Sequence, residues 1–532
     1  MIDDAFRNKQ KLFACFVDFR KAYDTVWRNG LLYKLLKNNV SIKFVNLIRN
    51  MYKELQLCIA LPNGLSLPFS SKVGLKQGCN LSPLLFNIFI NDIPNMIDNS
   101  NGDPPMLGNL PVSCLLYADD LVLLSRTQEG LQKSIEGLNK FSKKWYLEVN
   151  QKKTKCMVFS KGRPKQFPEF CFGNKTLEFC DEYCYLGVLF SRTGSLKPAA
   201  KFLTEKATNA MFALIRNLYG HRSVKPSIMI DLFDKMVVPI ALYGVEVWGV
   251  DFMPVNKRNN DYFDKGVLAK NPTENLHYRY LKMLLGVTRK TSSWAASTEF
   301  GRFPLAVKAF TLMCKFYLHL SVTKSPILKS ALSHSISLAG INTNSWFQTF
   351  TRILEVGKIQ LQDIENCNIS DKFKESFLHK WNLEKEAFQK DKGKMYILAK
   401  CKESFSMSQF LCVDNLCYSH KRAMARIRSS AHKFPIETDR YAKVPREKRM
   451  CSLGCKAIGD EKHFLLEYKH PAIRGIYEPL VSKLREQVVE LQNMIEGQDR
   501  LFHLMASTNR DVLVNVGKLC HRILARYQEI MF

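Results

Sequence analysis

The stretch CLLYADDLVLL, residues 114–124, decides the fold because it sets two adjacent carboxylates at a bend between apolar segments. The apolar runs predict two short buried strands joined by a tight turn at Tyr117-Ala118-Asp119-Asp120. Two negative charges about 4 Å apart repel by about 4 kcal/mol at an effective dielectric of roughly 20. Solvent, a basic partner or a divalent cation would offset that repulsion. The turn is therefore either a solvated hairpin tip or a cation site.

The composition indicates a large protein with a polyanionic partner. The chain has 532 residues, enough for several domains, and its formal charge of +29 favours nucleic acid over a membrane surface. The apolar stretch Val237–Val250 is too short to span a bilayer and contains Glu246. The start, Met1-Ile2-Asp3-Asp4, lacks the order of a signal peptide, and the 16 cysteines are scattered. We therefore expect a nuclear or cytoplasmic protein with reduced thiols, neither secreted nor bound to a membrane.

A second carboxylate comes at the end of another predicted strand. Asp18 follows an apolar run within FVDFRKAYD, residues 16–24. A lone aspartate at a strand end is usually a turn former, but two neighbouring strands would bring Asp18 to the edge that carries Asp119 and Asp120. Such clusters bind hard divalent cations, and two cations about 3.5–4 Å apart can clamp both oxygens of a phosphoryl transfer. With a basic surface, the expected substrate is nucleic acid.

The elements change in kind along the chain. Strands and helices mix up to about Gly194, and helical periodicity dominates afterwards. This order predicts an α+β domain followed by a mostly α-helical part.

Five motifs in this order resemble the reverse transcriptases of non-LTR (LINE-like) retrotransposons. Any one of them alone would be a weak signal, but their shared order is specific. They are FVDFRKAYD (16–24), VGLKQGCNLSP (73–83) running on to Asn91-Asp92, YADD (117–120), WYLEVN (145–150) with Lys153-Thr154-Lys155, and YLGV (185–188).

The resemblance implies a fold and a domain order. The fold would be a polymerase palm, an antiparallel sheet with packed helices, followed by a mostly α-helical thumb and C-terminal region. We expect the palm with partial fingers at 1–195 and a thumb-like region at 196–300. A helical connecting region would follow at 301–420, and a basic region with a degenerate Cys/His element at 421–532.

The resemblance also implies roles for the carboxylates and one tyrosine. Asp18, Asp119 and Asp120 would be catalytic ligands of Mg²⁺ (or Mn²⁺). Tyr23 would lie under the incoming sugar, where its ring would clash with a 2′-hydroxyl and favour deoxynucleotides. The alternative for Tyr23 is an aromatic residue of the core.

Three more residues carry implied roles in substrate binding and catalysis. Gln77, beside Gly78, would contact the template base or the incoming nucleotide, because glycine permits close backbone approach. Lys153 or Lys155 would stabilise or protonate the pyrophosphate leaving group. A solvated lysine is the alternative. A structural role is expected for Asp24.

A Cys/His element near the C-terminus is a candidate zinc site. Cys451, Cys455, His463 and His470 supply the right donor atoms. Their spacing departs from the Cys-x2-Cys, His, Cys order of the family, and Tyr468 stands where the last Cys is expected. A metal-free, decayed segment is the alternative. Nucleic-acid binding without the metal remains plausible because basic residues precede the element: Arg440, Lys443, Arg446, Lys448 and Arg449.

The resemblance leaves three functions open. The first is an RNA-directed DNA polymerase acting on an RNA template, a DNA primer and deoxynucleoside triphosphates. The second is a catalytically inactive, truncated or coopted nucleic-acid-binding remnant. It is suggested by the apolar strand that begins at Leu12, which leaves no room for the endonuclease and upstream fingers of the family. The third is a maturase-like helper or an unrelated two-metal nuclease.

Overall fold

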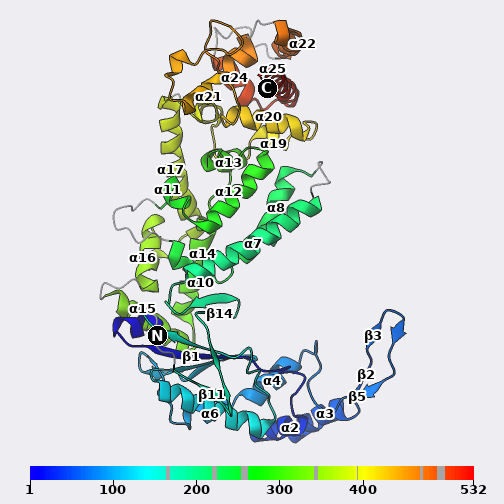
Figure 1. The fold of residues 1–532 in the computed structure, drawn as a ribbon, viewed down its shortest axis with the longest axis vertical. Coiled ribbons are helices and arrows are strands. Elements are labelled where there is room, and N and C mark those ends of the chain that lie inside the picture. The colour runs from blue at the N-terminus through cyan, green and yellow to red at the C-terminus, as the bar shows by residue number, and fades with distance from the viewer. Residues whose placement is uncertain are drawn as a thin grey trace. The chain divides into compact units, whose positions relative to one another are not determined.

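The computed structural model describes residues 1–162, 168–218, 224–252, 262–340, 345–391, 393–467, 471–487 and 498–531. The described residues form two compact units. Figure 1 shows the ribbon of the whole chain, coloured by residue number. The first unit holds Met1–Ala199 and Leu320–Gln348, and the second holds Ala200–His319 and Thr349–Phe532.

A five-stranded sheet forms the centre of the first unit (Figure 1). Its order is β13-β10-β1-β9-β8, and every pairing is antiparallel except that of β10 with β13. β1 is therefore central, flanked by the strand that leaves the YADD turn and by the strand of the fourth motif. The strands span Leu12–Val17 (β1), Cys114–Tyr117 (β8), Asp120–Ser125 (β9), Lys155–Phe159 (β10) and Glu178–Phe179 (β13).

Both faces of this sheet are buried because its strands are apolar at successive positions. Cys15 and Val17 point into one cluster, which is covered by five helices. Phe16 and Val122 point into the other, which is covered by α1 (Ile2–Arg7), the hairpin β14–β15 (Glu182–Tyr185, Val188–Ser191) and α15 (Pro326–Ala339). The five helices are α2 (Arg28–Lys37), α3 (Ile42–Lys53), α4 (Ser82–Ile90), α5 (Ile93–Asp98) and α6 (Gln128–Trp145).

Helix α6 illustrates how the sequence forms this layer. Thr127 caps its start, accepting a hydrogen bond from the amide of Gly130 at 3.2 Å, and Tyr146 ends it in the left-handed region at φ 56°. Its buried apolar residues recur at helical spacing, so one stripe faces the sheet. They are Leu131, Ile135, Leu138, Phe141 and Trp145.

The other strands of the first unit are short. They are β2 (Gln56–Leu57), β3 (Ala60–Leu61), β4 (Gly64–Leu65), β5 (Phe69–Ser70), β6 (Met106–Leu107), β7 (Leu110–Pro111), β11 (Cys171–Phe172) and β12 (Lys175–Thr176).

The described elements of the second unit are helical, which with the sheet of the first confirms the predicted α+β class. The helices are α7 (Lys197–Leu218), α8 (Pro226–Met236), α9 (Val238–Ala241), α10 (Val245–Trp248), α11 (Lys265–Leu268), α12 (Pro272–Leu285), α13 (Ser293–Phe300), α14 (Leu305–Val322), α16 (Trp346–Val356), α17 (Ile369–Asp391), α18 (Tyr396–Cys401), α19 (Gln409–Cys412), α20 (Tyr418–Arg428), α21 (Pro435–Tyr441), α22 (Pro471–Gln487), α24 (Gln498–Ala506) and α25 (Arg510–Met531). The predicted division into thumb-like, connecting and C-terminal regions stays a prediction.

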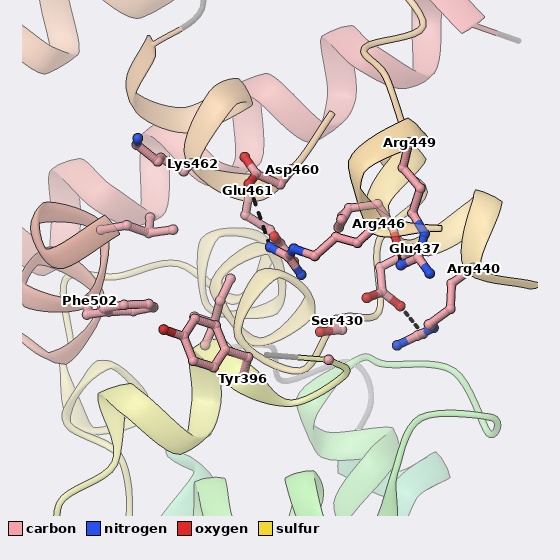
Figure 2. A pocket seen from close by; sticks show the side chains of 14 residues that line it. Tyr396, Ser430, Glu437, Arg440, Arg446, Arg449, Asp460, Glu461, Lys462 and Phe502 are labelled. Atoms are coloured by element: carbon pink, nitrogen blue, oxygen red, sulfur yellow. Dashed lines mark hydrogen bonds and ion pairs between the residues drawn. The ribbon is translucent and has the colours of Figure 1, made fainter. Parts of the chain in front are cut away.

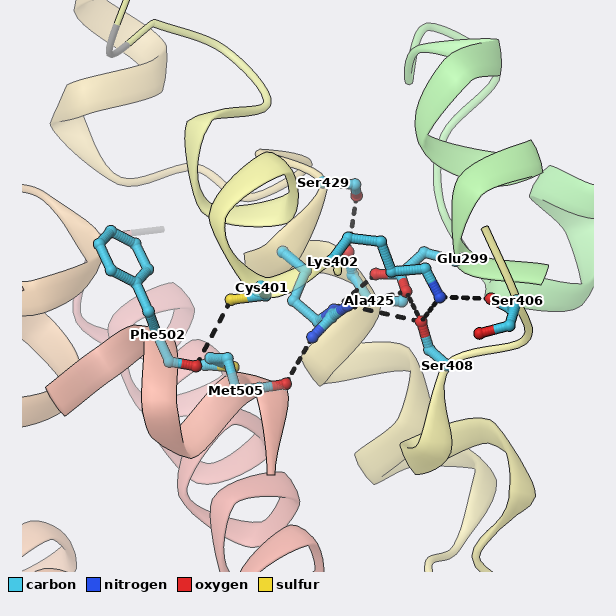
Figure 3. A network of polar contacts seen from close by, with 10 residues as sticks. Glu299, Cys401, Lys402, Ser406, Ser408, Ala425, Ser429, Phe502 and Met505 are labelled. Carbon is cyan, nitrogen blue, oxygen red and sulfur yellow. Dashed lines mark hydrogen bonds and ion pairs between the residues drawn. The ribbon is translucent and has the colours of Figure 1, made fainter. Parts of the chain in front are cut away.

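A buried polar network ties three parts of this unit together (Figure 3). Glu299 of α13 accepts hydrogen bonds from Arg428 Nε of α20 at 2.7 Å and from the hydroxyl of Ser408. Lys402 donates to that same hydroxyl at 3.0 Å. All four side chains are buried. Because removing one member would leave a buried charge unpaired, this network fixes how the helices meet.

Helix α14 is the most membrane-like of the described helices. It alone among them is long and apolar enough to cross a bilayer, and 44% of it is buried in the structure. Buried core helices share those properties, so this is weak evidence for a membrane span.

Candidate active site

The register of the sheet brings the first and third motifs together. Val17 of β1 pairs with Leu121 of β9 as the last pair of this ladder, so Asp18 directly follows the paired part of β1 and Asp120 directly precedes that of β9. Asp119 lies in the turn between β8 and β9, where Ala118 takes a φ of 50°. A non-glycine residue in the left-handed region is uncommon, and such strain clusters at functional sites.

The three carboxylates influence one another electrostatically. Burial raises the pKa of Asp120, and the charges of Asp119 and Asp18 raise it further. Asp18 is half-buried, whereas Asp119 and Asp120 are exposed. Mutual repulsion of this kind is relieved by a hard cation with oxygen ligands, so the donor set fits Mg²⁺ or Mn²⁺.

The fifth motif belongs to the same face of the sheet. Tyr183 stacks on Phe16 with ring centroids 4.3 Å apart, which holds the hairpin β14–β15 against β1. Burial raises the pKa of Tyr183 to about 12, and the charges of Asp18 and Asp120 add to the shift. The hairpin that carries the fifth motif is therefore close to the carboxylates.

The fourth motif supports Asp18 through its backbone. The amide of Asp18 donates to Thr154 Oγ1 at 3.2 Å, and the amide of Asn150 donates to the Asp18 carbonyl at 2.7 Å. Thr154 is 1% exposed. The sequence offered no reason to single out Thr154, since its partner lies 136 residues away.

Within the described part of the chain, one of the two candidate lysines has an acidic partner. Lys155 forms an ion pair with Glu178 of β13. Lys153 is exposed in the turn that precedes β10, and its amide donates to the Asn150 carbonyl at 3.1 Å. This contrast favours Lys153 for a role with substrate, which stays a prediction.

Tyr23 has features of both roles considered for it. It is half-buried, and its ring stacks on the fully buried Phe86 of α4 with centroids 4.5 Å apart. Burial raises its pKa, and the charge of Asp119 adds to the shift. The ring is thus anchored on the core and within the electrostatic reach of the YADD turn.

The second motif is docked on the first by backbone contacts. The amide of Leu75 donates to the Tyr23 carbonyl at 2.8 Å, and that of Gly74 donates to the Val26 carbonyl at 2.9 Å. A Cβ atom at Gly74 would lie 2.5 Å from the carbonyl oxygen of Asp24, and the φ of Gly74 is +83°. Only glycine permits this approach.

The docking positions Gln77 and Gly78 beside the first motif. Gln77 is exposed, and its Nε2 donates to Asp24 Oδ1 at 2.9 Å. Gly78 has a φ of +79° with open space around its Cβ position. Asp24 therefore orients Gln77, in keeping with the structural role expected for it.

Arg28 fastens the same region, and no pattern in the sequence indicated this. Its guanidinium donates to the carbonyls of Gly74 and Val73 at 2.9 Å each and to that of Ser71 at 2.5 Å. Three carbonyls of one loop are thus held by one side chain at the start of α2.

The Cys/His element is partly assembled. The ligand atoms of Cys451, Cys455 and His463 lie within 4.8 Å of one another, the one such group of three found among the described residues. Asp18, Asp119 and Asp120 are not among the groups of this kind found in the described residues. His470, the fourth residue predicted for zinc, lies outside the described residues.

Part of the basic run at 440–449 is neutralised internally. Arg440 pairs with Glu437, Arg446 Nη2 lies 3.8 Å from Asp460 Oδ2, and Arg449 Nη1 donates to the Ile436 carbonyl at 3.0 Å. The charge of this run is therefore less available to nucleic acid than the sequence suggests.

Comparison with known proteins agrees with this geometry. Residues 2–190 match the family model described as reverse transcriptase (RNA-dependent DNA polymerase). A probable RNA-directed DNA polymerase from transposon BS of Drosophila melanogaster is 27% identical over 254 residues, 46% of this chain and 27% of that protein. The enzyme from mobile element jockey of Drosophila funebris is 24% identical over 253 residues, with the same coverage.

A third relative is the Pol polyprotein of a type-1 retrotransposable element R2 from Nasonia vitripennis, 27% identical over 206 residues, 37% of this chain and 20% of that protein. The chain thus spans about a quarter of the length of the curated relatives that it matches. Apo telomerase from Candida tropicalis aligns with a TM-score of 0.28 at 12% identity over 62% of this chain and 54% of that one, which is too low to carry an argument.

The sheet, the carboxylates and the family match define residues 2–190 as a reverse transcriptase domain. Its relatives are enzymes of non-LTR retrotransposons, and the resemblance predicted from the five motifs is confirmed.

Proposed function

We propose that this chain is an RNA-directed DNA polymerase that adds deoxynucleotides to a primer 3′ end on an RNA template. The observation that carries the proposal is the ladder of β1 and β9, which ends at the pair Val17–Leu121 with Asp18 and Asp120 next in sequence and Asp119 in the adjoining turn. Acidic clusters of this kind serve nucleotidyl transfer, and the chain's charge of +29 suits a nucleic-acid substrate.

The carboxylates of Asp18, Asp119 and Asp120 would hold the metal ions. Mg²⁺ or Mn²⁺ bound there would stabilise the charge that develops on the attacking and leaving oxygens. Tyr23, anchored on Phe86, would exclude a 2′-hydroxyl from the sugar site.

Two side chains at the edge of the site would contact the nucleotide directly. Gln77, oriented by Asp24, would read the position of the template base or the incoming nucleotide. Lys153 would donate a proton or a positive charge to the pyrophosphate that leaves.

Primer extension on an RNA template with Mg²⁺ tests the proposal against its alternatives. The polymerase function predicts lengthened primers that require all four deoxynucleotides and disappear when a chelator removes the metal. Tight RNA binding without extension would favour an inactive nucleic-acid-binding remnant. Shortened RNA or DNA would favour a two-metal nuclease.

A zinc site at Cys451, Cys455 and His463 is a second proposal, supported by the 4.8 Å gathering of their ligand atoms. Zinc bound there would stabilise the fold of this segment rather than take part in polymerisation. We expect about one zinc per chain by elemental analysis, and loss of that zinc in Cys451→Ser. The exposed Cys412→Ser is the matched control. Equal zinc content in both variants would refute the site.

A further inference from the structure

Two pockets in the second unit differ in how their charges are balanced. The first, shown in Figure 2, is lined by arginines that face carboxylates of the same pocket. Arg440 pairs with Glu437, and Arg446 lies 3.8 Å from Asp460. Its charges are matched by the chain itself, so it has no need of an external anion.

The second pocket, which we name the basic cavity, has an excess of positive charge. Its volume is about 280 Å³, and Glu437 is the one carboxylate among its lining residues. That carboxylate is already paired with Arg440. Four cationic side chains line the cavity: Lys290, Lys394, Arg426 and Lys433.

Neighbouring positive charges act on two cationic residues of this region, Arg426 and Lys282. Arg426 Nε is buried and has no hydrogen-bond partner within the described part of the chain. The pKa of Arg426 is lowered by burial and by the charge of Arg422. The pKa of Lys282 is likewise lowered by burial and by the charge of Lys394. Like charges held together in this way are stabilised by a bound anion.

Hydroxyl groups and an aromatic ring complete the cavity. Thr288 and Thr291 contribute hydroxyls that can donate to phosphate oxygens. Tyr441, at the end of α21, is 72% exposed, and its ring centroid lies 5.7 Å from Arg440 Cζ. An exposed ring beside a cationic groove is the arrangement on which the bases of single strands stack.

We propose that the basic cavity binds one nucleotide of a single-stranded nucleic acid. Lys290, Lys394 and Arg426 would hold the phosphate, and Tyr441 would stack on the base. The volume of the basic cavity is close to the smallest volumes of small-molecule pockets, about 300 Å³. A cavity of this size accommodates a single nucleotide and not a duplex. This site is formed within the second unit and does not depend on the polymerase chemistry.

Fluorescence anisotropy on the full chain tests the site. The probes are a short single-stranded RNA, a single-stranded DNA of the same sequence and a blunt duplex, all without metal or deoxynucleotides. We expect Lys290→Ala/Lys394→Ala to weaken binding of a single strand about tenfold, and to lower the slope of log K against log salt concentration by the amount expected for about two phosphate contacts. The control is Lys308→Ala/Lys372→Ala, which removes the same charge from exposed positions of α14 and α17 outside the cavity.

The stacking role of Tyr441 is tested separately, by the affinity of Tyr441 variants for a single strand. Tyr441→Ala is expected to weaken single-strand binding about tenfold, while Tyr441→Phe retains it, because stacking requires the ring and not the hydroxyl. The RNA and DNA probes show which sugar the cavity prefers. Equal binding by the cavity and control double variants, or an equal loss for the duplex, would overturn the proposal. Because no extension is measured, failure here leaves the polymerase proposal untouched.

Discussion

The backbone amide of Asp18 donates a hydrogen bond to Thr154 Oγ1 at 3.2 Å, so a buried threonine of the fourth motif positions the first carboxylate of the candidate active site. The two residues flank neighbouring strands of the same sheet: Thr154 directly precedes β10 and Asp18 directly follows β1. Geometry at a metal-binding carboxylate depends on such support.

We expect Thr154→Val to lower primer extension about tenfold, because the Asp18 amide loses its acceptor and a tenfold rate change corresponds to about 1.4 kcal/mol. Thr154→Ser keeps the hydroxyl and should retain most activity. Single-turnover extension measures both rates. Equal rates for the valine and serine variants would show that this hydrogen bond does not position Asp18.

Tyr23 should control the choice of sugar through its ring. Tyr23→Ala is expected to raise incorporation of ribonucleotides relative to deoxynucleotides by about tenfold or more, since the steric block is removed. Tyr23→Phe keeps the ring stacked on Phe86 and should keep the discrimination. The ratio of the two incorporation efficiencies is the measurement. An unchanged ratio in Tyr23→Ala would make Tyr23 a core aromatic only.

Gly74 is required by the contact between the first two motifs. A methyl group there would lie 2.5 Å from the Asp24 carbonyl, at a φ of +83°. Gly74→Ala should therefore lower the free energy of unfolding by more than about 2 kcal/mol. Gly108→Ala, at a φ of +61° with open space, should cost only about 1 kcal/mol. Denaturant unfolding compares the two, and equal costs would contradict the close packing.

Lys402 should make stability depend on pH. Burial lowers its pKa to about 8, and although Glu299 opposes this shift, Arg428 adds to it (Figure 3). Because the folded pKa is below that of the unfolded chain, the unfolded state binds more protons between about pH 8 and 10, and stability rises with pH there.

Between pH 7 and 9.5 the unfolding free energy of the wild type should rise by about 2 kcal/mol relative to Lys402→Met. The exposed Lys308→Met serves as the control. Identical pH slopes for the wild type and Lys402→Met would show that this lysine titrates normally.

The candidate carboxylates could be singled out in the sequence because their signal is local. Asp119 and Asp120 interrupt an apolar run, and Asp18 ends one, so alternation and motif order indicate the same edge. The supporting contacts could not be predicted in this way. Thr154 meets Asp18 across 136 residues, and Glu299 meets Arg428 across 129, with no periodic pattern to pair them.

The location of the positive charge that is available to a partner could not be predicted from the sequence. The basic run at 440–449 suggested a nucleic-acid surface, yet three of its arginines are engaged by the chain itself. The excess charge instead gathers from Lys290, Lys394 and Arg426, which are distant in sequence and meet only in the folded chain. Composition predicts a polyanionic partner but not where it binds.

Single-nucleotide incorporation by Asp119→Asn, compared with Glu136→Gln, tests the central claim most directly. Both substitutions remove one exposed negative charge, but Glu136 lies on α6 and in none of the five motifs. We expect Asp119→Asn to lower the rate about a thousandfold, because loss of a metal ligand removes several kcal/mol of transition-state stabilisation, while the rate of Glu136→Gln stays near that of the wild type. Equal rates for the two variants would contradict the assignment of the YADD turn as the polymerase centre.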